Sequence, residues 1–529
     1  MRGLYLQFGT AFRGHGTCFT RRLVSVLCAA ALLLLSLTGC AQTAEKETGT
    51  EEISTPVGTD LFAPREEEPL PLPERFALPY EAEHTLDPIT CPDGMQQVVG
   101  SLLYEGLFRL NGSLEPELCL CESCGPDASF RFWTFNLRPG VTFSDGSPLS
   151  AYAVKAVLDR ARESVRYGSR LRNVAEISAA GETLYITLTA PNAGLPALLD
   201  IPICKETEGV PLGTGPYYFS KEDGGAWLLA NPAWWQGGGQ PTDRIFLEES
   251  QDAMLYRFTS GDVHLIVSNL IGGDPAAITG DIAYTDATSL RFHFLSCNAA
   301  RPLMSDASLR RALNRGVNRK GLVQDLLSGH ALAAQFPVSP ASPLYPKGLE
   351  EAYSSSALPA AAAEMGYNPD RPLILLVNSE NAFKVSVARS IAETYTADGI
   401  PTEVRVLPWE EYQAAIAAGD WDLCYGEAVL TADWNLSNLL GAEGALNPGG
   451  WSDWRCTQLL YTFSYTKDRA AAMGELCTYL RENVPLIPLC FGNTSVLTRA
   501  GVVENLSPTA AEPFYNLTAC AIHLKEPEA

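Results

Sequence analysis

The feature of this sequence that most restricts its fold is an alternation of strand and helix patterns that begins at Leu373. An apolar run, LILLV, is followed by a helical pattern over 382–397, the strand pattern TEVRVL, a helical pattern over 410–418 and the strand pattern WDLCY. Gly399 and Gly419 stand at the ends of the two helices, where a left-handed residue is favoured. Strands joined by crossover helices predict a mostly parallel sheet covered on both faces, and hence an α/β fold.

Earlier segments add strands and capped helices to this pattern. Alternating apolar residues predict two strands with one buried face each, Trp133, Phe135 and Leu137 in the first and Leu184, Ile186 and Leu188 in the second. A helix is predicted over 151–162, with Ser150 as its N-cap. Asp306 is expected to cap another helix whose apolar stripe is Leu309, Ala312, Leu313 and Val317, followed by a break at Asn318-Arg319 and a short helix over 322–327.

The N-terminus reads as an export signal that ends in a lipidation site. Arg21 and Arg22 precede an apolar run over 23–37, and Leu-Thr-Gly-Cys at 37–40 has the small-residue pattern of a bacterial lipobox. The run is short for a transmembrane helix. We expect residues 1–39 to be a lipoprotein signal peptide and Cys40 to carry the lipid; an ordinary cleaved signal and a single-span anchor are the alternatives.

The composition after Cys40 predicts a tether and restricts the possible partners. Residues 40–75 are rich in Thr, Glu and Pro without apolar periodicity, which predicts a disordered tether between membrane and domain. The formal net charge is −23, and the leader contributes four Arg and no acidic residue, so the mature chain carries −27. Because such a surface repels phosphate, we expect no nucleic-acid partner.

The sequence contains no motif that supports catalysis. H-E-x-x-H, G-x-S-x-G and G-x-x-x-x-G-K-[ST] are all missing, so we expect no enzyme and no cofactor. The histidines are widely separated, and no metal site is predicted. Cys119, Cys121 and Cys124 form the only cysteine cluster, which is compatible with a metal ligand set, with a local disulfide or with plain loop cysteines.

Five segments together resemble the extracellular solute-binding proteins of family 5, which serve peptide and nickel importers. The segments are YEGLFRLNGSLEPELCLCES at 104–123, FWTFNLRPGVTFSDGSPLSAYAVKAVLDRA at 132–161, LGTGPYYF at 212–219 with ANPAWWQG at 230–237, DASLRRALNRGVNRKGLVQDLLSG at 306–329 and AGDWDLCYGEAVLTADWNLSNLL at 418–440. They occur in the order that the family has and span the chain from about residue 78 to 519.

The resemblance implies a type II periplasmic-binding-protein-like fold with two main lobes, a hinge of crossing strands and a third, smaller inserted lobe. On this basis we expect lobe 1 over 76–285 with the inserted lobe at about 104–204, lobe 2 over 286–494 and a return to lobe 1 over 495–529. The implied localisation is the extracytoplasmic face of the bacterial membrane. The implied partners are a peptide ligand and the permease and ATPase subunits of an ABC transporter, with the protein itself a monomer.

The resemblance also assigns one ligand-binding residue. In peptide-binding members, the Asp of an A-D-Y segment accepts the α-ammonium group of the ligand, and Ala432-Asp433-Trp434 aligns with that segment. The preceding residues Val429 and Thr431 would pair with the peptide backbone. The alternative is that Asp433 caps the turn over 435–440. Four further aromatic residues are candidates for side-chain pockets or for lobe core: Tyr104, Trp409, Trp421 and Trp451, together with Trp434 itself.

The predicted function is therefore the substrate-binding lipoprotein of an ABC importer that captures oligopeptides. The alternatives are a surface sensor with a degenerate cleft and a binder of another ligand, such as a nickel chelate or a sugar. A hydrolase on the same scaffold would need a nucleophile beside a base, and no motif supplies one.

Overall fold

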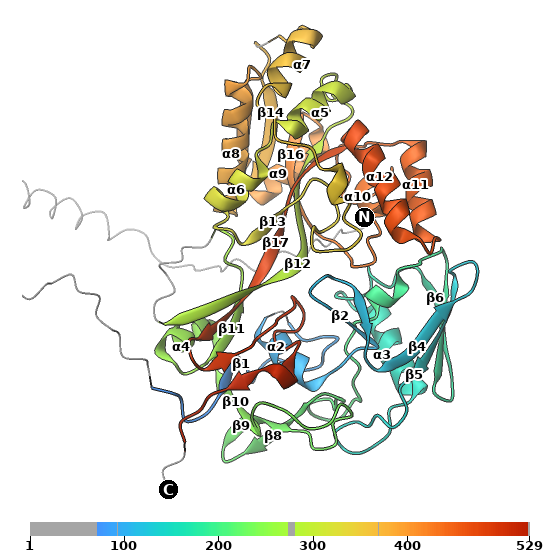
Figure 1. Cartoon of the computed structure of the whole chain (residues 1–529), viewed down its shortest axis with the longest axis vertical. Coiled ribbons are helices and arrows are strands. Elements are labelled where there is room, and N and C mark those ends of the chain that lie inside the picture. Colours follow the sequence, from blue (N-terminus) through green and yellow to red (C-terminus); the bar gives the residue numbers. More distant parts are fainter. Residues whose placement is uncertain (1–70, 93, 273–280, 369, 527–529) are drawn as a thin grey trace, which may run out of the picture. The chain divides into compact units, whose positions relative to one another are not determined.

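A computed structural model describes residues 71–526, apart from 93, 273–280 and 369 (Figure 1). The predicted signal peptide, Cys40 and most of the predicted tether lie outside the described residues. Within the described part, no helix is both long and apolar enough to cross a membrane.

The largest sheet has seven strands and contains the alternating segment that begins at Leu373. Its order is β11 (Leu265–Ser268), β17 (Leu486–Arg499), β12 (Ile282–Cys297), β16 (Leu423–Val429), β14 (Leu373–Asn378) and β15 (Thr402–Leu407), with β13 (Ala331–Ala333) joined to β17. β14 pairs parallel to both β15 and β16, as predicted. The remaining pairs are antiparallel. The sheet is therefore mixed, and the prediction of a mostly parallel sheet is wrong outside these three strands.

Strand β14, between β16 and β15, is buried along its whole length because helices cover both faces of this part of the sheet. Leu373, Leu375 and Val377 belong to one core cluster, which includes Val385, Ala388 and Ile391 of α8 (Ala382–Ala397). Ile374 and Leu376 face the opposite side and pack near Tyr412 of α9 (Trp409–Ala418) and near Trp421. The predicted helix over 382–397 and the two strands that flank it are confirmed. A strand buried on both faces is the usual form of the parallel part of such a sheet.

The helix pair that precedes this segment is also confirmed, with one boundary moved. α5 (Ala307–Arg315) starts after Asp306, whose carboxylate accepts from the Ser308 N–H. α6 (Arg319–Leu326) starts three residues earlier than predicted because the Asn318 side chain accepts from the Gly321 N–H and so acts as its N-cap. Asn318 thus begins a helix as well as interrupting the pattern.

Two long strands, β12 and β17, run side by side through the centre of the molecule (Figure 1). They are antiparallel and stay paired from Ile282 and Arg499 at one end to Ser296 and Leu486 at the other, with two register shifts. β11 joins one end of this pair, and β16 with its parallel neighbours joins the other. The pair therefore connects two groups of elements that have separate hydrophobic cores.

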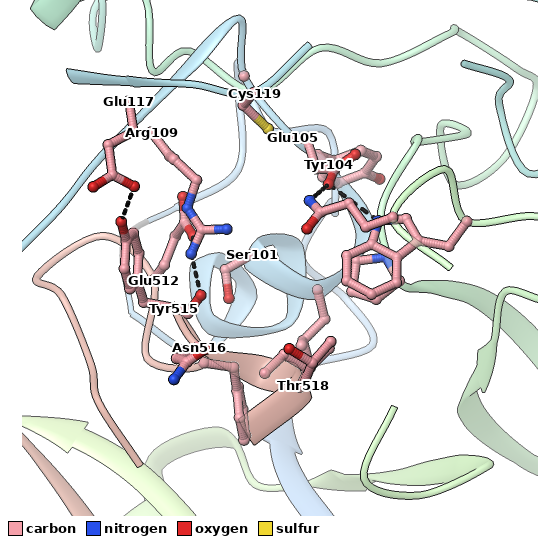
Figure 2. A pocket seen from close by; sticks show the side chains of 17 residues that line it. Ser101, Tyr104, Glu105, Arg109, Glu117, Cys119, Glu512, Tyr515, Asn516 and Thr518 are labelled. Atoms are coloured by element: carbon pink, nitrogen blue, oxygen red, sulfur yellow. Dashed lines mark hydrogen bonds and ion pairs between the residues drawn. The ribbon is translucent and has the colours of Figure 1, made fainter. Parts of the chain in front are cut away.

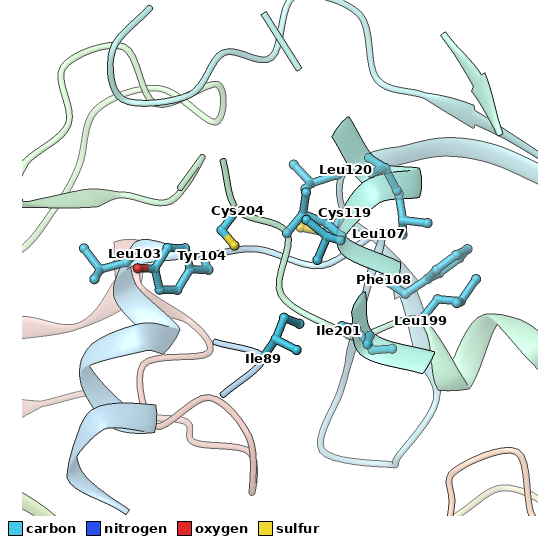
Figure 3. Close-up of a cluster of buried hydrophobic side chains, with 14 of the residues drawn as sticks. Ile89, Leu103, Tyr104, Leu107, Phe108, Cys119, Leu120, Leu199, Ile201 and Cys204 are labelled. Atoms are coloured by element: carbon cyan, nitrogen blue, oxygen red, sulfur yellow. The ribbon is translucent and has the colours of Figure 1, made fainter. Parts of the chain in front are cut away.

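The first of these groups surrounds a four-stranded sheet. Its strand order is β1 (Ala77–Tyr80), β10 (Arg244–Glu249), β9 (Gly225–Ala230) and β8 (Tyr217–Glu222). α2 (Met95–Leu103) packs beside this sheet, and its buried face continues into the apolar cluster around Tyr104, Leu107 and Cys119 (Figure 3).

A second four-stranded sheet, which we call the inserted sheet, lies within the first group. Its order is β4 (Cys121–Pro126), β5 (Phe132–Leu137), β7 (Thr183–Leu188) and β6 (Val174–Ala180), all antiparallel. The predicted alternation in β5 and β7 is confirmed by their burial patterns. α3 (Ala151–Glu163) covers the sheet, and the Ser150 hydroxyl caps it by accepting from the Ala153 N–H.

Shorter elements complete the described chain. They are β2 (Phe108–Leu110), β3 (Pro116–Leu118), η1 (Leu195–Leu198), η2 (Gln251–Ala253), α4 (Met254–Ser260), η4 (Lys347–Leu349), α7 (Ala357–Met365), α10 (Ser437–Leu440), α11 (Trp454–Ser464), α12 (Arg469–Asn483), β18 (Val503–Glu504), η5 (Leu517–Ala519) and β19 (Ala521–Ile522).

A buried group of charges lies where β12, β16 and the first turn of α8 meet. Glu427 contacts Lys384, with 2.6 Å between Nζ and Oε2, and also contacts the Arg291 guanidinium. The His293 ring lies beside them, fully buried, with Nδ1 3.4 Å from the Tyr425 hydroxyl. Burial raises the pKa of Glu427, but Lys384, His293 and Arg291 outweigh burial and bring it to about 2. Burial lowers the pKa of His293 to about 4.

The buried histidines predict a loss of stability in mild acid. Burial also lowers the pKa of His264 to about 4, and its Nδ1 accepts from the Ala77 N–H. Both rings have a folded pKa below the unfolded value of 6.5, so the unfolded chain binds protons more readily than the folded protein in acid. The free energy of unfolding is therefore unaffected by protonation of these rings above pH 6.5 and falls as the pH drops towards 4. At roughly 1.4 kcal/mol per pKa unit, each ring is expected to cost on the order of 2 kcal/mol between about pH 7 and about pH 4.5.

Urea unfolding at these two pH values measures the loss, and His293→Phe is the matched variant because it keeps an aromatic ring but cannot titrate. The decrease in the free energy of unfolding between these two pH values should be smaller in this variant by the contribution of one histidine. Glu427 contributes little to this difference because its lowered pKa removes stability only below the ordinary value of 4.5. An unchanged loss in His293→Phe would contradict the prediction.

Candidate functional site

Asp433 lies buried in the segment between β16 and α10, with 3% of its surface exposed. Its Oδ2 accepts from the Asn192 side-chain amide at 2.9 Å. Its Oδ1 accepts from the Thr431 hydroxyl and from the Asn435 backbone N–H, the latter at 3.2 Å. The carboxylate thus makes the local turn contact that the capping alternative expects. It also makes a contact with a residue 241 positions away in the sequence, which no local pattern indicated.

Asn192 belongs to the loop that follows the inserted sheet, so Asp433 lies at a contact between that loop and the segments around α11 and α12. The Ala193 N–H donates to the Ser464 carbonyl at 2.7 Å in the same contact. Gly194 allows the close approach, because a Cβ at this position would lie 2.9 Å from the Asp433 Cβ. The site is therefore assembled from two distant parts of the chain.

Arg469, the first residue of α12, supplies a cation beside this carboxylate. Its Nη2 donates to the backbone carbonyl of Asp433, and the guanidinium lies over the Phe463 ring at 4.5 Å. Its Nε is buried and has no hydrogen-bond partner among the described residues. Burial lowers the pKa of Arg469, and the nearby Asp433 charge opposes that effect. Among the described residues, the Asp433 carboxylate accepts hydrogen bonds from neutral groups, and the Nε–H of Arg469 donates to none.

The other predicted site residues occupy different environments. Trp434 has a positive φ of 55° and packs edge-on to Phe491 in a hydrophobic core, which also contains Trp451. Thr431 contacts Asp433, whereas Val429 is 65% exposed at the end of β16. Trp409 starts α9 and stacks on Tyr412 in a separate cluster that also holds Trp421. The structure therefore groups Thr431 with Asp433 and places the tryptophans in or against core clusters.

Tyr104 lies in the first group of elements, on the wall shared by two cavities. Its ring is buried, and its hydroxyl donates to the Pro211 carbonyl at 3.1 Å. One cavity has a volume of about 250 Å³, and the other of about 180 Å³. Both are also lined by Ser101, Gly106 and Glu512.

The larger of these two cavities is lined by a carboxylate, Glu105, whose hydrogen-bond donors in the described part of the chain are all neutral. Glu105 accepts from the Thr214 hydroxyl at 2.8 Å and from the indole N–H groups of Trp234 and Trp235 at 3.1 and 2.7 Å. The Gln236 amide is a fourth donor. Burial raises the pKa of Glu105, and the hydrogen bonds oppose that effect. The GTGP and NPAWWQG segments singled out in the sequence are therefore joined through this one carboxylate.

Gly213 explains why the GTGP turn needs glycine. A Cβ at this position would lie 1.8 Å from the carbonyl oxygen of Leu103 at the end of α2. The turn therefore packs backbone against backbone and presents Thr214 to Glu105.

The opposite wall of this cavity carries a second network (Figure 2). Arg109 lies over the Tyr515 ring at 3.8 Å and contacts Glu512 at 3.4 Å, and the Tyr515 hydroxyl donates to Glu117. Burial raises the pKa of Glu512 to about 7, although Arg109 opposes that effect. The smaller cavity adds Arg166, Tyr167 and Arg170 to its lining.

Sequence reasoning missed Asn192, Arg469 and Glu512. The first lies in a loop without a recognisable motif, and the other two are single charged residues without a motif. Only their spatial position relates them to Asp433 or to the cavities. Within the described part of the chain, no group of three or more His, Cys, Asp or Glu side chains is arranged to hold a metal ion.

Comparison with known proteins supplies the context for this geometry. Residues 115–445 match the model of the bacterial extracellular solute-binding proteins, family 5 Middle. Protein XP55 of Streptomyces lividans is 29% identical over 319 residues, which cover 53% of this chain and 56% of that protein. The glutathione-binding protein GsiB of Shigella flexneri serotype 5b (strain 8401) is 26% identical over 306 residues, or 52% of this chain and 56% of that protein. The chain thus spans a little over half the length of these curated relatives.

The fold of a solved structure matches a larger share of this chain than the sequences of these relatives do. The crystal structure of the nickel ABC transporter from Bacillus halodurans superposes with a TM-score of 0.71 at 24% identity, covering 83% of this chain and 98% of that one. This agreement, together with the two long strands that connect separate cores, confirms the predicted type II periplasmic-binding-protein fold.

Proposed function

This chain belongs to the bacterial extracellular solute-binding proteins of family 5, and from that premise we propose that it captures short peptides for an ABC importer. The relative GsiB is named as a glutathione-binding protein, and glutathione is itself a small peptide derivative. Asp433 would hold the amino terminus of the peptide. The observation that carries the proposal is a buried carboxylate that has neutral donors and no side-chain cation bonded to it among the described residues.

The physical argument is that a buried carboxylate gains most from a cationic partner. A charge-assisted hydrogen bond is roughly twice as strong as a neutral one, and burial strengthens it further. We propose that the ligand's ammonium group replaces the Asn192 amide at Oδ2 of Asp433. The unpartnered Nε of Arg469 is then available to a carbonyl or carboxylate oxygen of the same ligand.

We propose that the two predicted lobes close on the ligand. We propose that 76–285 and the return from 495 form lobe 1, that 286–494 form lobe 2, and that β12 and β17 are the hinge between them. The separate hydrophobic clusters on either side of these strands support this division. Asn192 lies in the inserted lobe, at about 104–204, so exchange of Asn192 for an ammonium group would couple ligand binding to the position of that lobe.

The export signal, the lipidated Cys40 and the tether complete the proposal. They would hold a monomeric receptor at the outer face of the bacterial membrane, close to the permease and ATPase subunits that accept its cargo. The lipobox pattern at 37–40 supports this arrangement.

A thermal-shift experiment with paired peptides tests the proposed ligand class. Di- to hexapeptides with a free amino terminus are compared with the same peptides after N-acetylation, which converts the ammonium group into an uncharged amide and adds one acetyl group. At a concentration of about 100 times Kd, a bound peptide stabilises the folded protein by roughly 2.7 kcal/mol. We expect the free peptides to raise the melting temperature and the acetylated ones to raise it far less.

Equal shifts from both sets would show that the ammonium group is not the anchor. A shift produced by a nickel complex or a sugar and by no peptide would refute the peptide assignment, while family membership would stand.

A further inference from the structure

The cysteine cluster noted in the sequence contains a C-x-x-C segment whose two thiols lie next to each other. Cys121 and Cys124 are both in strand β4, rather than in a loop. In a regular strand, residues three apart lie about 10 Å apart on opposite faces. Here a β-bulge intervenes, since Cys121 pairs with Leu137 while Ser123 pairs with Asn136, which leaves Glu122 as an extra residue. Cys124 pairs with Phe135, two residues from Leu137 on the partner strand, so the bulge places both cysteines on one face of β4.

The two thiols differ sharply in access to solvent. Cys121 is fully buried and its Sγ lies 3.2 Å from the Ser123 carbonyl oxygen, whereas Cys124 is the one exposed cysteine among those that the structure describes. The hydrogen bond from Cys121 lowers the pKa of Cys124, and burial opposes that effect. The same contact and burial raise the pKa of Cys121. Cys124 is thus the accessible thiol with the lowered pKa, and Cys121 is a buried thiol on the same face of the strand with a raised pKa.

We propose that Cys121 and Cys124 form a thiol–disulfide exchange site on the inserted sheet, with small disulfides and thiols as its substrates. An accessible nucleophilic thiol beside a buried resolving thiol is the arrangement that this chemistry requires. The site is separate from Asp433 and does not depend on the proposed peptide ligand.

The reaction balances with a small disulfide as oxidant. The Cys124 thiolate attacks one sulfur of R–S–S–R, forms a mixed disulfide and releases one thiolate, which takes up a proton. The Cys121 thiol then loses its proton and attacks the Cys124 sulfur, which forms the Cys121–Cys124 disulfide and releases the second R–SH. The two cysteines are oxidised and the small disulfide is reduced to two thiols; a small dithiol reverses the reaction.

The test uses the full chain and hydroxyethyl disulfide as oxidant. This probe carries neither an ammonium group nor a carboxylate, so it cannot be retained through Asp433 or Arg469. After treatment, the exposed thiols are alkylated and the protein is digested and mapped by mass spectrometry. We expect a Cys121–Cys124 disulfide, and alkylation of Cys124 at least about tenfold lower than in the untreated protein.

Two variants separate the roles of the cysteines. Cys121→Ser removes the resolving thiol and should trap the mixed disulfide on Cys124, while Cys124→Ser should leave Cys121 unreacted in the folded protein. Cys119→Ala, two residues from Cys121, is the matched control and should oxidise as the wild type does. Circular dichroism checks that each variant is folded.

The proposal would be overturned by the absence of a disulfide in the wild type, by a disulfide between other cysteines, or by a Cys121→Ser variant that accumulates no mixed disulfide. A Cys119→Ala variant that fails to oxidise while folded would assign the resolving role to Cys119 and equally overturn it.

Discussion

Replacement of Asp433 by alanine is expected to raise the Kd for a peptide with a free amino terminus by on the order of 100-fold or more. Removal of one partner of a buried charge pair costs about 2–5 kcal/mol, and each 1.4 kcal/mol changes Kd about tenfold. Asp433 is 3% exposed, so the ammonium group would lose its charged partner in a buried environment. Isothermal titration calorimetry with one peptide identified in the thermal-shift screen measures the change.

Asp433→Asn is the sharper variant because it keeps an acceptor oxygen for Thr431 and the Asn435 N–H but loses the charge. A double-mutant cycle, in which the second change is N-acetylation of the peptide, isolates the contact between Asp433 and the ammonium group. If Asp433 binds the ammonium group, acetylation should weaken binding strongly in the wild type and hardly at all in Asp433→Asn. Additive effects of the two changes would mean that Asp433 acts only by holding the turn over 435–440.

Replacement of Lys384 by methionine is expected to lower the free energy of unfolding by about 3–5 kcal/mol. That is the usual cost of removing one partner of a buried ion pair. Glu427 would keep the contact with Arg291, but that side chain is 43% exposed and compensates the buried charge less well than Lys384 does. The Lys384 side chain is 3% exposed and its Nζ lies 2.6 Å from Glu427, which is itself 15% exposed. Methionine retains an unbranched stem of similar length, so little packing is lost. Urea unfolding at neutral pH measures the change.

The double variant Lys384→Met with Glu427→Gln is the control. It removes both charges, so most of the lost stability should return. Arg291 also loses its partner Glu427, but its side chain is 43% exposed. If the double variant is as unstable as Lys384→Met, the loss comes from packing of the lysine stem and the electrostatic explanation is wrong.

The secondary structure of the alternating segment that begins at Leu373 was predictable because its signals are local. β14, α8 and β15 follow from hydrophobic period and from glycine at the helix ends, and these patterns depend only on near neighbours in the chain. Asn318 was interpreted as a helix break because a capping residue and a breaker look alike in one sequence. The mixed character of the large sheet was not predictable from the alternation, because β12 and β17 join it from segments outside that pattern.

The sequence by itself determined the fold class, the family, the export signal pattern and the choice of Asp433 as a ligand-binding candidate, since each was inferred from short segments and from their order along the chain. Only the tertiary structure decided what surrounds Asp433. The Asn192 amide and the Arg469 guanidinium reach it from segments that lie far away in sequence. The same holds for Glu105, whose four donors come from two turns more than 100 residues away. Burial and hydrogen bonding of a polar side chain depend on distances between remote segments, and those distances exist only once the chain has folded.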